Sequence, residues 1–235
     1  MKEITKYYIG TSGWFYQWNE DKSLDWYINQ TGFNAIELNA SFYRFPFPNQ
    51  IKKWSQVGSS LRWSVKVTRR ITHLNKFSLE NSSELWKRFY ELFQPLDHLI
   101  DFYLFQAHPK FSDENKDVLC KFIYFTNLGK RFAFEPRHPS WFNKNNYTWA
   151  KKIGITLVSV DSPKFQNIIV NNHHIIYLRL HGRTKWYSHN YNDEELLEIK
   201  NHIFASGKFK KVYIFFNNDH DMLENGKRMK VLLSS

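Results

Sequence analysis

Three carboxylates and one histidine supply the residue types that acid–base chemistry needs. Glu37, Glu135 and Asp161 each stand at the end of a short apolar run, and His181 ends another, "IIYLRLHG". Carboxylates and imidazoles can give or take a proton during a reaction. A carboxylate pair such as Glu37 and Glu135 also suits glycoside hydrolysis. We expect these four residues to be catalytic, with Glu135 and His181 as the acid and base and the other two as supporting carboxylates.

Basic side chains accompany them, most densely in "RLHGR" at 179–183. Arg179 and Arg183 flank His181, and neighbouring cations favour the neutral imidazole. Arginine binds phosphate or carboxylate with two parallel hydrogen bonds, and Gly182 lets a ligand approach the backbone. We expect Arg137, Arg179 and Arg183 to hold an anionic or polyhydroxylated ligand. The alternative is that these arginines neutralise the three carboxylates, since buried charges need partners.

Eight β-like runs, most of them followed by an amphipathic stretch, position these side chains. We predict strands at 7–11, 34–39, 62–67, 101–106, 131–136, 156–161, 175–182 and 211–218. Helices are predicted at 24–30, 49–57, 83–93, 115–125, 147–154, 193–204 and 226–235. The pattern predicts one domain over 1–235, an α/β fold with a single (β/α)₈ TIM-type barrel and an irregular or missing helix between strands six and seven. A doubly wound sheet is the alternative, but "GTSGWFYQW" lacks its glycine pattern.

In such barrels the site lies at the carboxyl ends of the strands, and every predicted strand here ends in a polar or ionisable group. Trp14, Tyr43 and Trp141 are expected as exposed aromatic rings near that face, as in sugar-binding clefts. The residues expected to bind substrate are Trp14, Asn39, Tyr43, Lys66, His73, Gln106, Arg137, Arg179, Arg183 and Asn217.

Six stretches of this sequence also resemble a known family. They are "IGTSGWFYQW", "IELNASFYRFP", "VTRRITH", "FEPRHPSW", "RLHGR" and "FFNN". In order and spacing they are similar to the domain-of-unknown-function family 72, the YecE-like proteins, from about Tyr8 to Asn218. The resemblance implies a TIM-type barrel and no particular reaction. The family's recurrent positions fall on the candidate residues above and on Gly10, Ser12, Trp141, Gly182 and Asn218.

The sequence departs from the family pattern in three places. Ala107 and His108 stand where the family tends toward proline, and Pro136 separates Glu135 from Arg137. The last helix, which follows strand eight, reads "LENGKRM" instead of an alanine- and asparagine-rich turn.

Cofactor signals are weak. Glu37, Glu135, Asp161 and His181 offer oxygen and nitrogen ligands for Mg²⁺, Mn²⁺ or Zn²⁺, but neither H-x-H nor H-E-x-x-H is present. A divalent metal is therefore not favoured, and no nucleotide-cofactor motif appears. The single cysteine, Cys120, excludes an internal disulfide and is expected as a core thiol.

The formal net charge is +11, from 33 Lys and Arg against 22 Asp and Glu, which can attract nucleic acid. The alternative is compositional bias, because Asn, Ile, Phe and Tyr are also abundant. No apolar run is long enough for a membrane span and "MKEITKYYIG" is not a signal peptide, so we expect a cytoplasmic protein without a membrane partner. The oligomeric state is not specified.

These features favour an enzyme, a hydrolase or isomerase that acts on a small polar, anionic or sugar-like substrate at the carboxyl-terminal face of the barrel. The alternative is a nucleic-acid-binding protein or a metal-dependent nuclease or phosphodiesterase. A third interpretation is a barrel that has lost catalysis and serves as an interaction scaffold.

Overall fold

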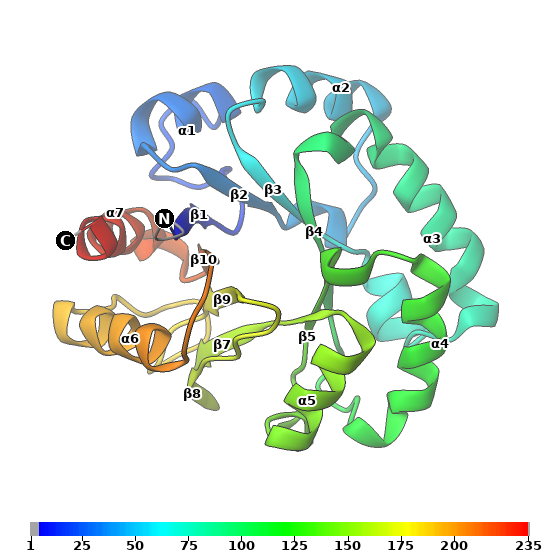
Figure 1. Cartoon of the computed structure of the whole chain (residues 1–235). Helices are drawn as coiled ribbons and strands as arrows, with labels where there is room; N and C mark the ends of the chain where they lie inside the picture. Colours follow the sequence, from blue (N-terminus) through cyan, green and yellow to red (C-terminus); the bar gives the residue numbers. More distant parts are fainter. Residues whose placement is uncertain (1–4, 235) are drawn as a thin grey trace. The chain divides into compact units, whose positions relative to one another are not determined.

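The structure is a computed structural model that describes residues 5–234 (Figure 1). The chain divides into two compact units. Unit 1 comprises Met1–Glu37, Ser60–Arg62 and Val158–Ser235, and unit 2 comprises Leu38–Ser59 and Trp63–Leu157. Neither unit is a continuous stretch of sequence. The expectation of one domain over 1–235 stays a prediction.

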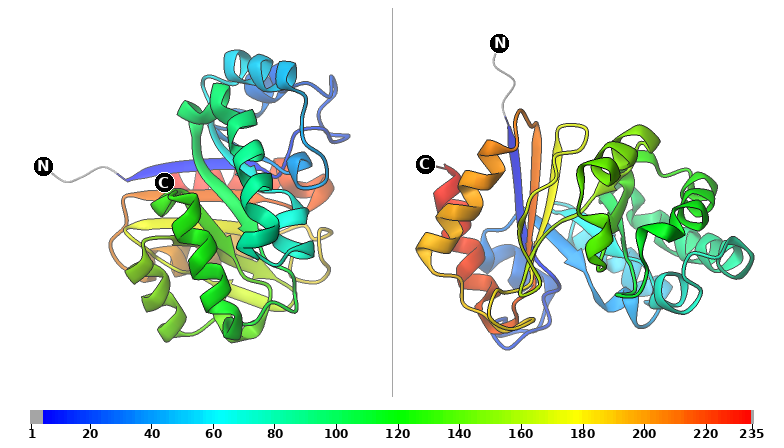
Figure 2. Two further views of the ribbon diagram at one scale, coloured as in Figure 1. Left: turned by 90° about the vertical axis from the view of Figure 1, so that its right-hand side faces the viewer. Right: turned by 90° about the horizontal axis from the view of Figure 1, so that it is seen from below.

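Unit 1 contains a five-stranded sheet in the order β1-β10-β9-β7-β8. The first four strands are parallel, and β8 pairs with β7 in the antiparallel sense. The strands are β1 (Lys6–Thr11), β7 (Ser159–Ser162), β8 (Phe165–Ile168), β9 (Ile175–Leu180) and β10 (Lys211–Phe216). The helices are α1 (Leu24–Thr31), α6 (Asp193–Ala205) and α7 (Met222–Ser234). Figure 2 shows α6 and α7 side by side along one face of the sheet, where α7 contacts β1 and β10.

Unit 2 carries the parallel strands β3 (Arg62–Lys66), β4 (Ile100–Gln106), β5 (Phe132–Glu135) and β6 (Thr156–Leu157), in that order. Its helices are α2 (Pro48–Val57), α3 (Leu79–Phe93), α4 (Lys116–Thr126) and α5 (Lys144–Ile153). Aromatic side chains fill its core: Phe105 stacks on Phe132 with ring centroids 3.9 Å apart, and Trp86 and Phe122 pack against Phe105. This packing explains much of the high aromatic content.

Side-chain caps set the starts of three helices. Ser23 accepts a hydrogen bond from the backbone of Trp26 at α1, and Asn143 caps α5 in the same way. At α6, Asn192 and Glu195 form a reciprocal capping box. Such caps satisfy backbone N–H groups that the first helical turn leaves without partners.

Side chains take the place of backbone pairing between β1 and the start of β2 (Ala35–Leu38). The backbone N–H of Thr11 donates to the Tyr27 hydroxyl at 3.1 Å, and that hydroxyl donates to the Ala35 carbonyl at 2.9 Å. Asn34 accepts from the Ile9 N–H at 2.9 Å. The two strands are thus connected without a regular ladder.

The α/β class is confirmed, and each predicted helix has a counterpart. The helix expected at 226–235 begins earlier, at Met222, and Ser235 lies outside the described residues. The predicted single strand 156–161 is wrong, because it divides into β6 and β7. Each half pairs with a different strand, β6 with β5 and β7 with β9.

The link between predicted strands six and seven lacks a helix, as expected, and instead forms β8, which was not predicted. Ser162 closes the β7–β8 turn by accepting from the Phe165 N–H at 3.1 Å. Over residues 5–234 the strands form two open five-stranded sheets, so a closed eight-stranded barrel is not confirmed. Within the same residues no helix combines the length and apolar character that crossing a membrane requires.

Candidate functional site

Glu37, at the end of β2 in unit 1, is fully buried and surrounded by donors. The Arg179 guanidinium donates to both carboxylate oxygens, through Nη2 at 2.5 Å and Nε at 2.9 Å. The Tyr177 hydroxyl adds a hydrogen bond at 2.8 Å, and the Ser12 hydroxyl adds another. Tyr177 and Arg179 meet the same carboxylate because alternate residues of β9 face the same side of the sheet. This geometry is that of a buried, fully hydrogen-bonded ion pair.

His181 continues the same face of β9 and is also fully buried. Its Nε2 lies 3.4 Å from Nη1 of Arg179, and its Nδ1 lies 3.1 Å from the Asn217 amide. Because a guanidinium can only donate, Nε2 is the acceptor in the contact with Arg179. The atom of Asn217 that faces Nδ1 is the amide nitrogen Nδ2.

Asp161 of β7 is the centre of a second buried group in unit 1. Its carboxylate accepts from Nε of Arg183 at 3.1 Å, from the Tyr191 hydroxyl at 2.8 Å and from the Asn167 N–H at 2.9 Å. Arg183 also donates to Glu198 at 2.6 Å. Burial by itself lowers the pKa of Arg183, but the hydrogen bonds to Asp161 and Glu198 outweigh it and raise the pKa above its ordinary value.

Glu135 ends β5 in unit 2, level with Gln106 at the end of β4. Its buried carboxylate accepts from the Gln106 amide at 3.0 Å and pairs with Nη2 of Arg137 at 2.9 Å. The carboxyl-terminal ends of two neighbouring parallel strands thus bring a carboxylate, an amide and a guanidinium together.

His73 of unit 2 lies in the π-helical turn Arg70–Leu74 that follows β3. Its Nδ1 is 2.9 Å from the Thr72 hydroxyl, and its ring contacts the Phe42 and His108 rings at 5.1 and 5.4 Å. The Nζ of Lys66 lies 4.1 Å from the centre of the Phe42 ring.

The pKa of His73 is lowered from 6.5 to about 4. Burial contributes most, followed by the charges of His108, Lys66, Arg137 and Arg69. His73 is therefore a neutral imidazole at neutral pH, and the charges of Lys66, Arg137 and Arg69 act on it.

The other predicted binding residues differ in exposure. Tyr43 is 66 % exposed, whereas Trp14 is half-buried. Within the described residues the side-chain oxygen of Asn39 is buried without a hydrogen-bond partner. The prediction of an exposed Trp141 is wrong: its ring is fully buried against Phe134, and its N–H donates to the Phe111 carbonyl at 2.8 Å.

Of the predicted site residues, four lie in one cluster of unit 1: Glu37, Arg179, His181 and Asn217. Asp161 and Arg183 form a second cluster in the same unit. Unit 2 joins Gln106 to Glu135 and Arg137, and places His73 near Lys66. Sequence reasoning missed Tyr177, which the two-residue period from Arg179 would have found. It also missed Tyr191, which comes from a loop that no local pattern places. No group of three or more His, Cys, Asp or Glu side chains among residues 5–234 has the geometry to hold a metal ion.

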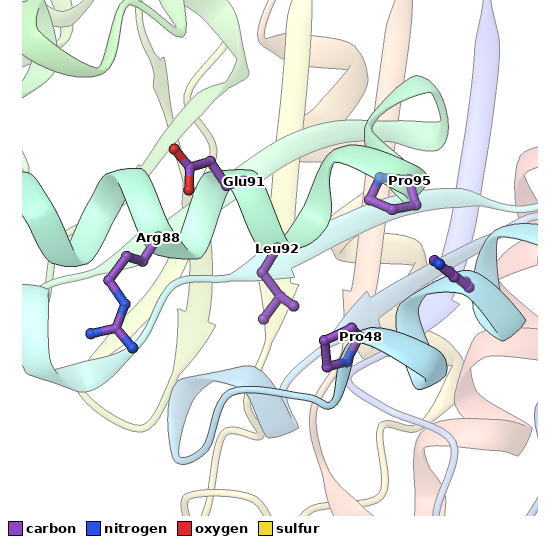
Figure 3. Close-up of a pocket in the computed structure, with 6 residues that line it drawn as sticks. Pro48, Arg88, Glu91, Leu92 and Pro95 are labelled. Atoms are coloured by element: carbon purple, nitrogen blue, oxygen red, sulfur yellow. The ribbon is translucent and has the colours of Figure 1, made fainter.

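A hollow of about 430 Å³ lies elsewhere in unit 2, and Figure 3 shows Pro48 at the start of α2 and Leu92 near the end of α3 beside it. Its walls are Pro48, Lys52, Arg88, Glu91, Leu92 and Pro95. None of these was a predicted site residue.

Comparison with known proteins supports the resemblance read from the sequence. Residues 8–234 match the model of the family described as "Protein of unknown function DUF72". No curated protein matches the chain.

Solved structures of two DUF72 family proteins have the same fold. The Enterococcus faecalis V583 protein is 22 % identical, with 99 % of each chain covered and a TM-score of 0.82. The Thermotoga maritima MSB8 protein is 24 % identical, with 97 % of this chain and 99 % of that chain covered and a TM-score of 0.83. A fusion protein of a xylose isomerase-like TIM barrel and 4-hydroxyphenylpyruvate dioxygenase is 12 % identical over 96 % of this chain and 41 % of that chain, with a TM-score of 0.59.

Proposed function

Because the chain belongs to the DUF72 family, whose description names no reaction, we propose from the geometry of unit 2 that the protein is an enzyme acting on a small anionic substrate. The observation that carries this proposal is the Glu135 carboxylate, buried at a strand end and held by Gln106 and Arg137. The same Arg137 also acts on the neutral imidazole of His73. One cation therefore couples a carboxylate and an imidazole, the two groups most used for proton transfer.

Lys66 and Arg137 bind the anionic group of the substrate in this mechanism. A bound anion offsets their positive charge, which raises the pKa of His73 from about 4 toward its ordinary value. Burial, the largest cause of the lowered pKa, stays in place, so the imidazole is a better proton acceptor with substrate bound than without it. Glu135 is the second proton-transfer group, and the reaction is a hydrolysis or isomerisation of a phosphorylated or carboxylated, sugar-like molecule.

In this proposal the buried carboxylates of unit 1 have a structural role at the ends of its strands. Glu37 and Asp161 are engaged by Arg179 and Arg183, which is the ion-pair alternative that the sequence left open. The catalytic roles predicted for Glu37, Asp161 and His181 stay predictions, as do ligand-holding roles for these arginines, Trp14 and Asn217. A closed (β/α)₈ barrel and a cytoplasmic location are also retained as proposals, the first supported by the likeness to a structure described as a TIM barrel.

Inorganic phosphate is the first probe of this function. We expect phosphate to raise the pKa of His73, read from the NMR titration of its ring protons, and Lys66→Met to abolish that rise. The exposed His98 provides the internal control, since its titration should not move. A His73 titration that is identical with and without phosphate contradicts the anion site.

Turnover tests the enzyme directly. Wild-type protein and Glu135→Gln are incubated with a panel of sugar phosphates and hydroxy acids, and product is detected by NMR. We expect Glu135→Gln, which keeps the side-chain shape, to lower the rate at least ~100-fold on any substrate the wild type converts. Equal rates in the two proteins would remove Glu135 from the mechanism.

A further inference from the structure

The charge excess is concentrated in one part of the sequence. From Leu38 to Leu79 there is no Asp or Glu at all. The same stretch contains eight basic residues: Arg44, Lys52, Lys53, Arg62, Lys66, Arg69, Arg70 and Lys76. Compositional bias would spread lysine and arginine along the chain but would not remove acidic residues from one segment.

Unit 2 displays part of this stretch as an arginine–aromatic surface, which we define as Tyr43, Arg44, Phe47, Arg69, Arg70 and Leu74. All six are exposed, with Tyr43 at 66 %, Phe47 at 59 % and Leu74 at 68 %. Large apolar side chains at such exposure are usually a sign of a binding surface when they gather together. These come from two loops, one after β2 and one after β3.

Contacts join the two loops and pair rings with guanidinium groups. Arg69 lies 6.0 Å from the centre of the Tyr43 ring, and Arg44 lies 5.8 Å from that of Phe47. Phe42, next to Tyr43, packs against His73 of the second loop. Each ring therefore has a cation beside it, at a spacing that suits a flat base on the ring and a phosphate on the guanidinium.

We propose that the arginine–aromatic surface binds single-stranded nucleic acid. Arg44, Arg69 and Arg70 contact phosphates, while Tyr43 and Phe47 stack on bases. Only unpaired bases offer their faces to such rings, and a duplex would leave both rings without partners. An acidic peptide would satisfy the arginines but not the rings. This binding goes beyond the enzyme proposed above and depends on neither Glu135 nor His73.

Fluorescence anisotropy with labelled single strands of about ten nucleotides tests the proposal. With three phosphate contacts, raising salt from about 50 to about 200 mM should weaken binding about 20-fold. Arg69→Ala should reduce that salt effect to about sevenfold. Tyr43→Ala and Phe47→Ala should each raise Kd about fivefold or more.

Matched controls come from unit 2 itself. Tyr124→Ala removes a tyrosine of similar exposure, 68 %, from α4, and Arg88→Ala removes an exposed arginine from α3. Both should bind the single strand like the wild type, and circular dichroism checks that every variant is folded. Absence of binding at the lower salt overturns the proposal. So does equal affinity for a duplex, equal competition by polyglutamate, or the same loss of affinity in Tyr124→Ala as in Tyr43→Ala.

Discussion

Glu37 and Arg179 show how a buried charge is tolerated at the level of single residues. Both side chains are 0 % exposed, so each would be costly to bury alone. The guanidinium meets both carboxylate oxygens, and Tyr177 and Ser12 supply further donors. The pair is stable because every charged atom group has a partner, and removal of one member leaves the other buried and uncompensated.

We expect Glu37→Leu to lower the free energy of unfolding by about 3–5 kcal/mol, because Arg179 then keeps an unpaired buried charge. The double variant with Arg179→Met should recover a substantial part of the loss. Urea unfolding of the four proteins yields the coupling energy.

The exposed pair Glu84 and Lys87 is the control, with a similar N–O distance of 2.6 Å. Its coupling should stay below about 1 kcal/mol. A coupling as small for Glu37 and Arg179 would show that their burial adds nothing.

His73 predicts a pH dependence of stability. Its pKa is about 4 in the folded protein and near 6.5 in the unfolded chain. As pH falls through that window the unfolded chain binds the proton first, so the free energy of unfolding decreases. We expect His73→Gln to lose less stability than the wild type between about pH 7 and pH 4.5, measured by urea unfolding at both values. Equal losses in the two proteins would place the pKa of His73 near its ordinary value.

At the scale of elements, β9 and β1 have different roles: β9 positions a row of polar side chains, and β1 is linked to β2 through side chains. The alternation of β9 places Tyr177 and Arg179 on one face, and His181, just after the strand, continues this row of polar side chains. In β1 the edge facing β2 is served by side chains, since the Tyr27 hydroxyl links the Thr11 N–H to the Ala35 carbonyl. A single buried hydroxyl there does the work of a ladder hydrogen bond.

Tyr27→Phe should therefore lower the free energy of unfolding by about 1–3 kcal/mol, because two buried backbone groups lose their partner. Tyr124→Phe, on the exposed side of α4, should change it by less than about 0.5 kcal/mol. Thermal melting monitored by circular dichroism compares the two. Equal melting temperatures would mean that the strands close up and pair directly.

At the scale of the whole molecule, the chain alternates between its two compact units. Unit 1 is assembled from three segments and unit 2 from two, so neither can be cut out as one continuous piece. The parallel strands of unit 1 come from both ends of the sequence, since β1 pairs with β10. Unit 1 therefore needs both the first and the last segments of the chain to complete its sheet.

We predict a single cooperative unfolding transition for the full chain. Calorimetry tests it, because a two-state protein has equal calorimetric and van't Hoff enthalpies. Two resolved transitions would contradict the prediction and would establish two independently folding units.

Much of the fold could be read from the sequence because it depends on local patterns. Apolar runs predicted the strands, and amphipathic stretches predicted the helices, including α6, whose predicted range 193–204 lies within Asp193–Ala205. The predicted strand 156–161 failed because its apolar run is continuous although its two halves pair with different strands. Periodicity cannot report which neighbour a strand chooses.

For the candidate site, too, local features could be predicted from the sequence and long-range contacts could not. The sequence by itself determined the chemical groups available, such as Gln106 at the end of one strand and Glu135 at the end of the next. Only the tertiary structure decided that Glu37 is engaged by Arg179 and Asp161 by Arg183, and that Trp141 is buried. The reason is physical: residue type and strand period are encoded locally, whereas burial and partner choice depend on which distant segments pack together.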